Sequence, residues 1–171
     1  MTWRGTTTVK DRFFSCLPYA LPLLEVSMLG LMFAGSGIGL FAQFPPLQLI
    51  LIPLMPLILF YNLFSFGGFS FGNIVIFLLL LTLIVRNTNI PHFIRFNTMQ
   101  AILLDILLFL ARIILMVVLA PIAGTSLFMD TILNVVLLGT LAAIGYSIVQ
   151  TLRGQYAEIP TLSEAVYMQV R

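Results

Sequence analysis

Long stretches of this chain contain almost no charged side chain, and these stretches constrain its fold more than any other feature. Only 8% of the 171 residues are charged and 60% are hydrophobic, whereas a soluble domain carries about 25% charged residues. So few charges cannot cover a water-soluble domain of this size. The sequence therefore predicts an all-α integral membrane protein, a single polytopic domain over residues 1–171.

A helix needs roughly 20 apolar residues to cross about 30 Å of hydrocarbon. Stretches of this kind predict four transmembrane helices, at residues 46–64, 71–85, 99–122 and 128–149. Pro53 and Pro56 lie in the middle of the first, and each proline removes a backbone hydrogen bond. We expect that helix to be kinked or locally unwound.

Residues 13–44 are apolar enough for a fifth span, but they contain Pro18, Pro22, Glu25 and a glycine cluster. Charge placement favours four spans, because cytoplasmic loops carry the basic residues. With four spans, the loops at 65–70 and 123–127 contain no basic residue, and one side holds all of the following: Arg4, Lys10, Arg12, Arg86, Arg95, Arg153 and Arg171. A span at residues 13–34 would move the first three of these to the other side. We therefore predict an interfacial or re-entrant segment at 13–44, with both termini in the cytoplasm or stroma.

Asp105 and Arg112 lie inside the third predicted span. Seven residues make almost two helical turns, so the two side chains share a face, about 10 Å apart along the axis and too far apart to pair without a third group. Ionised groups at this depth normally face the protein interior or a wet cavity. With Asn134 of the fourth span, they form a predicted intramembrane polar seam. The seam either lines a groove that accepts water or substrate, or it is a structural network with partners such as Asn62, Asn73 or Asn134.

Polar side chains also alternate with aromatic ones where the third span begins. His92, Arg95, Asn97 and Gln100 make up this predicted membrane-face motif. A basic, aromatic stretch at a membrane face is typical of a helix at the level of the lipid headgroups. The simpler interpretation is that Arg95 and the phenylalanines only anchor the end of the helix.

The polar tail at residues 150–171 leaves the predicted membrane. Thr161 and Glu164 have the spacing of a capping box, which predicts a short helix over residues 162–169. Tyr156, Glu158, Glu164 and Tyr167 are candidate docking residues for a partner. The tail packed on the protein's own cytoplasmic face is the alternative.

The sequence favours no enzymatic role and no cofactor. One histidine and one cysteine make a metal cluster improbable, and a net charge of +2 does not suggest nucleic acid. We find no nucleophile with an adjacent base and no phosphate-binding glycine loop after a strand.

Four stretches, at residues 17–25, 43–57, 85–107 and 147–171, resemble the Tic-twenty family, the twenty-kilodalton membrane subunit of the protein translocon at the chloroplast inner envelope. The most specific blocks are IRFNTMQAILLDI at 94–106 and RGQYAEIPTLSEA at 153–165. The short basic N-terminus resembles the cyanobacterial or plastid-encoded branch, in which no transit peptide is expected.

The resemblance implies a four-span protein of the plastid inner envelope or a cyanobacterial membrane, with both ends stromal or cytoplasmic. It implies a central subunit of a protein-translocation complex and a candidate component of its channel. The expected partners are other membrane subunits, further copies of the chain, a precursor polypeptide and membrane lipids. Two other functions stay open: a structural or assembly subunit of a larger membrane complex, and a small-molecule carrier that uses Asp105 and Arg112.

Overall fold

Residues 9–34 form one continuous helical segment that packs in the bundle, within the region where the sequence predicted an interfacial or re-entrant segment. The computed structural model describes residues 7–66, 69–70, 72–160 and 162–170. In it, α1 (Val9–Cys16), the 3-10 turn η1 (Leu17–Tyr19) and α2 (Ala20–Ala34) follow one another without a break. The helix begins at a capping box, in which Thr8 Oγ1 accepts from the Asp11 amide and the Asp11 carboxylate accepts from the Thr8 amide. Pro18 lies at the start of the 3-10 turn, where its missing N–H is tolerated.

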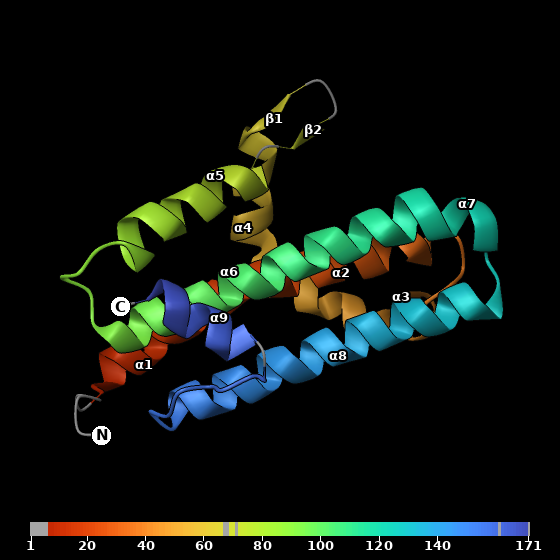
Figure 1. Ribbon diagram of the computed structural model, residues 1–171. Coiled ribbons are helices and arrows are strands. Elements are labelled where there is room, and N and C mark those ends of the chain that lie inside the picture. Colours follow the sequence, from red (N-terminus) through yellow and green to blue (C-terminus); the bar gives the residue numbers. More distant parts are fainter. Residues whose placement is uncertain (1–6, 67–68, 71, 161, 171) are drawn as a thin grey trace.

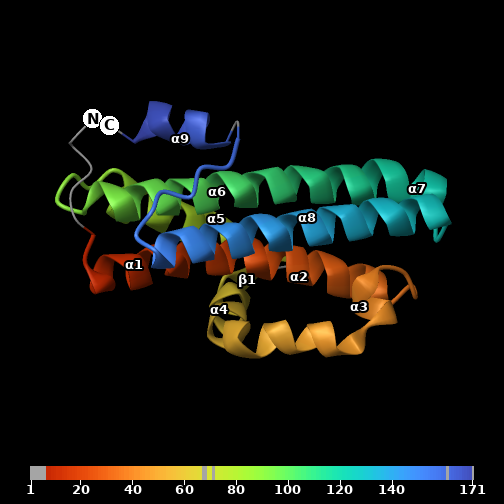
Figure 2. The same cartoon turned by 90° about the horizontal axis from the view of Figure 1, so that it is seen from below.

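Two further long helices pack beside this one. The chain enters α6 (His92–Ile113) directly after Pro91, and the helix continues through the π-helical turn η4 (Ile114–Leu119) to α7 (Ala120–Ala123). The antiparallel return is α8 (Leu127–Leu152), which Ser126 caps by accepting a 3.4 Å hydrogen bond from the Met129 amide. Figures 1 and 2 show α1–α2, α6 and α8 side by side, with α2 packed on both of the others.

The segment between α2 and α6 is more irregular. It contains α3 (Leu40–Gln43), the 3-10 segment η2 (Pro45–Ile50), α4 (Leu51–Leu63), the paired two-residue strands β1 (Ser65–Phe66) and β2 (Phe69–Ser70), α5 (Gly72–Leu79) and the π-helical η3 (Leu80–Val85). Figure 2 shows a sharp change of direction between η2 and the end of α4, in the segment that contains the mid-run prolines. Together these elements carry the chain from the end of the bundle near α3 back to the end where α6 begins (Figure 1).

The four-span count predicted from the sequence is not the count that the structure gives. In the described part of the chain, three helices are long and apolar enough to cross a membrane: Val9–Ala34, His92–Ala123 and Leu127–Leu152. The first lies in the segment expected at the surface, and its 26 residues would extend about 39 Å. The predicted spans at 46–64 and 71–85 correspond to the shorter helices Pro45–Tyr61 and Gly72–Val85. A 14-residue helix reaches only about 21 Å, which is less than the hydrocarbon thickness.

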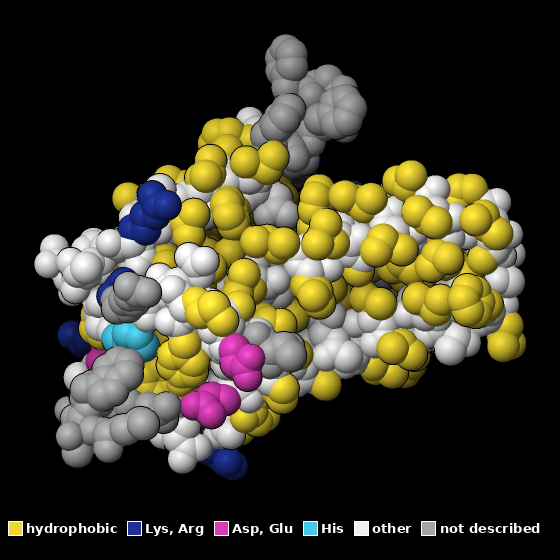
Figure 3. Space-filling model, viewed as in Figure 1, with side chains coloured by type: hydrophobic (Ala, Val, Ile, Leu, Met, Phe, Trp, Pro, Cys, Tyr) yellow, Lys and Arg dark blue, Asp and Glu magenta, His cyan; other side chains and the backbone are white. Residues whose placement is uncertain are grey.

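Basic residues gather at one end of the bundle even with this different division into helices. Arg12 Nη1 donates to the Leu152 carbonyl at 3.4 Å, and Arg95 Nε donates to the Val85 carbonyl at 2.8 Å. The first contact joins the start of α1 to the end of α8, and the second joins the end of η3 to the start of α6. The helices α1 and α6 also pack against each other. In Figure 3 the Lys and Arg side chains lie over this end, which we call the basic end, and hydrophobic side chains cover the opposite half. The N-terminal helix can start at the basic end because the irregular segment 45–85 returns the chain to it.

Candidate functional site

A fully buried polar network joins the three long helices near the basic end. Asn97 of α6 lies at its centre: its Oδ1 accepts from Tyr19 Oη of η1 at 3.2 Å and from Thr151 Oγ1 of α8 at 2.9 Å. The Asn97 Nδ2 donates to the Phe93 carbonyl at 2.9 Å. All three side chains are at most 1% exposed. The network therefore fixes the register of three helices at one point.

Gln100 extends this polar layer one turn along α6. Its Nε2 donates to Ser147 Oγ of α8 at 3.2 Å, and both residues are fully buried. Its Oε1 has no hydrogen-bond partner among the described residues. Asn97 and Gln100 thus lie inside the bundle, not at the membrane face as the sequence suggested, because their side chains face α8 and the N-terminal helix.

Arg112 of α6 pairs with Glu25, a residue of the segment that was predicted to lie at the membrane surface. Arg112 Nη1 donates to Glu25 Oε1 of α2 at 2.9 Å. Glu25 is 5% exposed and also lies close enough to Asp105 to interact with it electrostatically. Arg112 therefore pairs with Glu25 of α2, whereas Asp105 is only a like-charged neighbour of Glu25. The pairing removes the cost of a lone buried ion on α2 and explains how a helix containing Glu25 is tolerated there.

Asp105 is the less well satisfied member of this cluster. It is 4% exposed, and its Oδ1 has no hydrogen-bond partner among the described residues. The Asn73 side chain of α5 is its hydrogen-bonding neighbour, and Tyr61 of α4 lies near both carboxylates. We call Glu25, Asp105, Arg112, Asn73 and Tyr61 the mid-bundle cluster. It links the two short helices to α2 and α6.

Asn134 does not join Asp105 and Arg112. Its Oδ1 accepts from the Leu40 amide at 2.8 Å, and its Nδ2 donates to Asp130 at 3.3 Å. Asp130 also accepts from the Gly39 amide and from Gln43 Nε2. Asp130 and Asn134 of α8 thus accept hydrogen bonds from the backbone amides at the start of α3. This contact lies at the end of the bundle opposite the basic end. The seam predicted with Asn134 is therefore not found, because the hydrogen bonds of Asn134 go to Leu40 and Asp130 and not to Asp105 or Arg112.

His92 and Arg95 do lie at the basic end, and His92 contacts the tail. Its ring nitrogens lie 3.1 Å from Tyr156 Oη and 3.3 Å from the Val170 carbonyl. Tyr156 also packs edge-on against Phe93 and Phe96, with centroid distances of 5.2 and 4.9 Å. The membrane-face motif is therefore divided: His92 and Arg95 are at the basic end, whereas the two amides are internal.

The tail packs on its own α6. The helix α9 (Leu162–Gln169) has the predicted bounds, although the proposed cap residue, Thr161, lies outside the described residues. Val166 and Val170 are buried against Phe96 and Met99, and the tilted rings of Tyr167 and Phe96 pack together with their centroids 4.9 Å apart. Tyr167 Oη donates to Glu158 at 3.1 Å, while Glu158 and Glu164 are both exposed. Of the four candidate docking residues, the tyrosines face the protein itself and the glutamates face outward.

Three residues that join the helices were not among the predicted site residues: Tyr19, Glu25 and Asp130. Each is a polar residue in an otherwise apolar segment, and Glu25 counts against a span when the sequence is considered alone. The pairing of Glu25 with Arg112 could have been predicted, because the two residues carry opposite charges and each lies in an apolar stretch. In the part of the chain that the structure describes, no three His, Cys, Asp or Glu side chains gather as metal ligands would.

The described residues form a helical bundle with apolar outer faces and three helices long and apolar enough to cross a membrane, as in α-helical membrane proteins. Residues 8–166 match the family model described as "Chloroplast import apparatus Tic20-like". The chain therefore belongs to the Tic20 family, as the IRFNTMQAILLDI and RGQYAEIPTLSEA blocks suggested.

The relatives come from cyanobacteria and from plastid-bearing organisms. A Synechocystis "Tic20 family protein" is 47% identical over 171 residues, which cover 100% of this chain and 99% of the relative. A Gracilaria "Tic20 family protein Ycf60" is 37% identical and matches 95% of this chain and 76% of its own. The Arabidopsis "Protein TIC 20-v, chloroplastic" is 38% identical over 98 residues, 57% of this chain and 41% of the relative.

Proposed function

We propose that this protein is a non-enzymatic membrane subunit of a protein-translocation complex and forms part of the wall of a protein-conducting path. The observation that carries the proposal is the match of residues 8–166 to the import-apparatus family model. The names of the family model and of its plant relatives link the family to chloroplasts and to chloroplast import. The three long apolar helices fit a membrane subunit of such machinery. The corresponding location is a plastid inner envelope or a cyanobacterial membrane, with both termini on the stromal or cytoplasmic side.

The packing inside the bundle supports a polypeptide path between this chain and other subunits, and not a path through the middle of a single chain. Tyr19, Asn97 and Gln100 fill the space between the three long helices. A polypeptide could not pass there without separating the helices. Other membrane subunits or further copies of this chain would supply the remaining walls, against the exposed apolar faces that include Val117 of η4 and Val135 of α8.

Photocrosslinking of a stalled precursor tests this function. A photoreactive residue at Val117 or Val135 should capture the precursor, because both side chains face outward and are 69% and 65% exposed. The same probe at buried Leu137 is the matched control and should capture none. A precursor that reaches no outward position on α6, η4 or α8 would contradict the role in the path.

A carrier function is the second candidate, and the buried Asp105 favours it. Its Oδ1 has no partner among the described residues, so it is available to an ion or a proton. Flux of a small cation into proteoliposomes that is lost in Asp105→Asn would support a carrier. Unchanged flux would count against it.

Tail deletion separates both functions from an assembly role. Removing residues 155–171 should leave the complex intact if the tail only packs on α6. Loss of co-purifying subunits, with the remaining chain still folded, would favour the assembly subunit.

A further inference from the structure

A groove with a volume of about 580 Å³ lies between α5 and η3 on one side and α6 on the other, and it reaches the basic end of the protein. Its walls are apolar along the helices, with Phe77 and Leu81 on one side and Met99, Ile102 and Ile106 on the other. The end of α9 contributes Met168 and Gln169. We call this space the arginine groove, because Arg86 and Arg95 line it as well.

The two arginines have unused hydrogen-bonding capacity. Arg95 is 9% exposed, and its Nε donates to the Val85 carbonyl at 2.8 Å. Arg86 follows the last residue of η3 and is exposed. Among the residues that the structure describes, no carboxylate lies within ion-pair distance of either guanidinium. Two positive charges therefore converge on the groove without a negative partner from the described chain.

This combination of charge and apolar surface matches one class of ligand. A guanidinium presents a planar array of donors that fits two oxygens of a phosphate. Basic pockets between membrane helices bind anionic lipid headgroups, and the apolar strip from Leu81 to Ile106 offers a surface for an acyl chain. We infer that the arginine groove binds an anionic glycerophospholipid, with its phosphate at Arg86 and Arg95 and an acyl chain along the strip.

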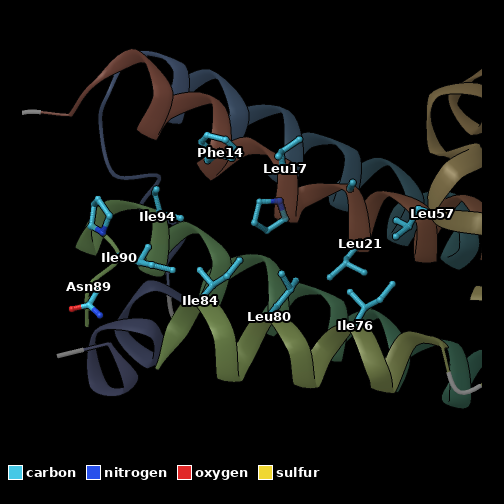
Figure 4. A pocket seen from close by; sticks show the side chains of 13 residues that line it. Phe14, Leu17, Leu21, Leu57, Ile76, Leu80, Ile84, Asn89, Ile90 and Ile94 are labelled. Atoms are coloured by element: carbon cyan, nitrogen blue, oxygen red, sulfur yellow. The ribbon is translucent and has the colours of Figure 1, made fainter. Parts of the chain in front are cut away.

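A neighbouring groove shows what the arginines add. It has a volume of about 470 Å³ between η1 and α2 on one side and α5 and η3 on the other, and its lining includes Leu17, Leu21, Ile76 and Leu80 (Figure 4). No charged side chain of the described residues lines it. Such a groove would accept hydrocarbon of any lipid, whereas the arginine groove selects for charge.

Lipid binding to the intact protein in mild detergent tests the inference. Native mass spectrometry would compare phosphatidylglycerol with phosphatidylcholine of the same acyl chains. Arg86→Gln should weaken phosphatidylglycerol binding about fivefold and leave phosphatidylcholine unchanged, since one basic residue near a lipid surface contributes about that factor. Arg153→Gln is the matched control, because Arg153 is an exposed arginine after α8 that does not line the groove, and it should have no such effect.

A second pair of variants tests the acyl strip with the charges intact. Ile106→Trp should fill the arginine groove and weaken phosphatidylglycerol binding, and Leu80→Trp in the neighbouring groove should not. Equal binding of the two lipids by the unmodified protein would overturn the inference, as would equal effects of Arg86→Gln and Arg153→Gln. Competition by glycerol 3-phosphate at the same concentration would also overturn it, because the site would then bind a free phosphate ester.

Discussion

Arg112 of α6 donates a 2.9 Å hydrogen bond to Glu25 of α2 and so joins the N-terminal helix to the centre of the bundle. The pair is asymmetric, because the Arg112 side chain is 38% exposed and that of Glu25 is 6% exposed. A buried acid thus meets a base that also reaches the surface. This contact helps to make the helical segment Val9–Ala34 a member of the bundle, where the sequence predicted a surface segment.

Removing one partner of this pair should destabilise the protein. Glu25→Gln leaves the Arg112 guanidinium without its counter-charge, and we expect a loss of about 1–3 kcal/mol, measured by thermal unfolding in mild detergent. The double variant Glu25→Gln/Arg112→Gln should recover part of this loss. Asp105→Asn is the control within the same cluster. It should be tolerated, because the carboxyl that it replaces has an oxygen without a partner among the described residues.

Asn97 should be the most sensitive polar residue near the basic end. Asn97→Leu leaves the Tyr19 and Thr151 hydroxyls without their shared acceptor. We expect a loss of about 1–2 kcal/mol in unfolding free energy, in the upper range for hydrogen bonds between membrane helices. Thr98→Val, which removes a bond only to the Ile94 carbonyl of the same helix, should cost less. Equal effects of the two variants would contradict a special role for the network.

His92 and Tyr156 should hold the tail on α6. His92→Ala removes the contacts with Tyr156 Oη and the Val170 carbonyl. Hydrogen exchange of residues 162–170 should then become at least several-fold faster, while α8 stays protected. Glu164→Gln, at an exposed position of α9, should leave exchange unchanged. If His92→Ala had no effect, the aromatic contacts of Tyr156 and Tyr167 with Phe96 would suffice to hold the tail.

The position of the N-terminal helix can be tested with single cysteines in a Cys16→Ser background. If Val9–Ala34 crosses the membrane, Ser36→Cys and Thr125→Cys should react with an impermeant maleimide from one side. Thr88→Cys and Gln155→Cys should react from the other. All four positions are exposed in the structure. Labelling of Ser36→Cys from the same side as Thr88→Cys would return residues 13–44 to the surface assignment.

Gly154 should not tolerate a side chain. Its φ is +76°, and a Cβ would lie 2.6 Å from Thr7 Oγ1 and 3.0 Å from the Arg12 guanidinium. Gly154→Ala should therefore lower the melting temperature by several degrees. Gly124→Ala is the control, because Gly124 also has a positive φ, +54°, but no atom lies within 4 Å of its Cβ position. Its effect measures backbone strain alone, without disturbance of the α1–α8 contact. The larger effect is expected at Gly154.

The sequence by itself determined the class of protein, the two C-terminal long helices, the tail helix and the family. Apolar length and the absence of charge are local properties, so 99–122 and 128–149 were found within the bounds of the observed helices. The blocks at 94–106 and 153–165 identify the family from their residue order alone. The gathering of basic residues at one end was also predicted, because their positions between the apolar stretches place them on one side.

Only the tertiary structure decided which apolar segments become long helices and which polar residues meet. Pro18, Pro22 and Glu25 count against a span when residues 13–44 are considered alone, but a 3-10 turn accommodates Pro18 and Arg112 neutralises Glu25. Asn97, Tyr19 and Thr151 are far apart in sequence and form one network because three helices pack in one register. The free energy of burying a polar group depends on its partner, and the partner is chosen by packing between helices that no local pattern encodes.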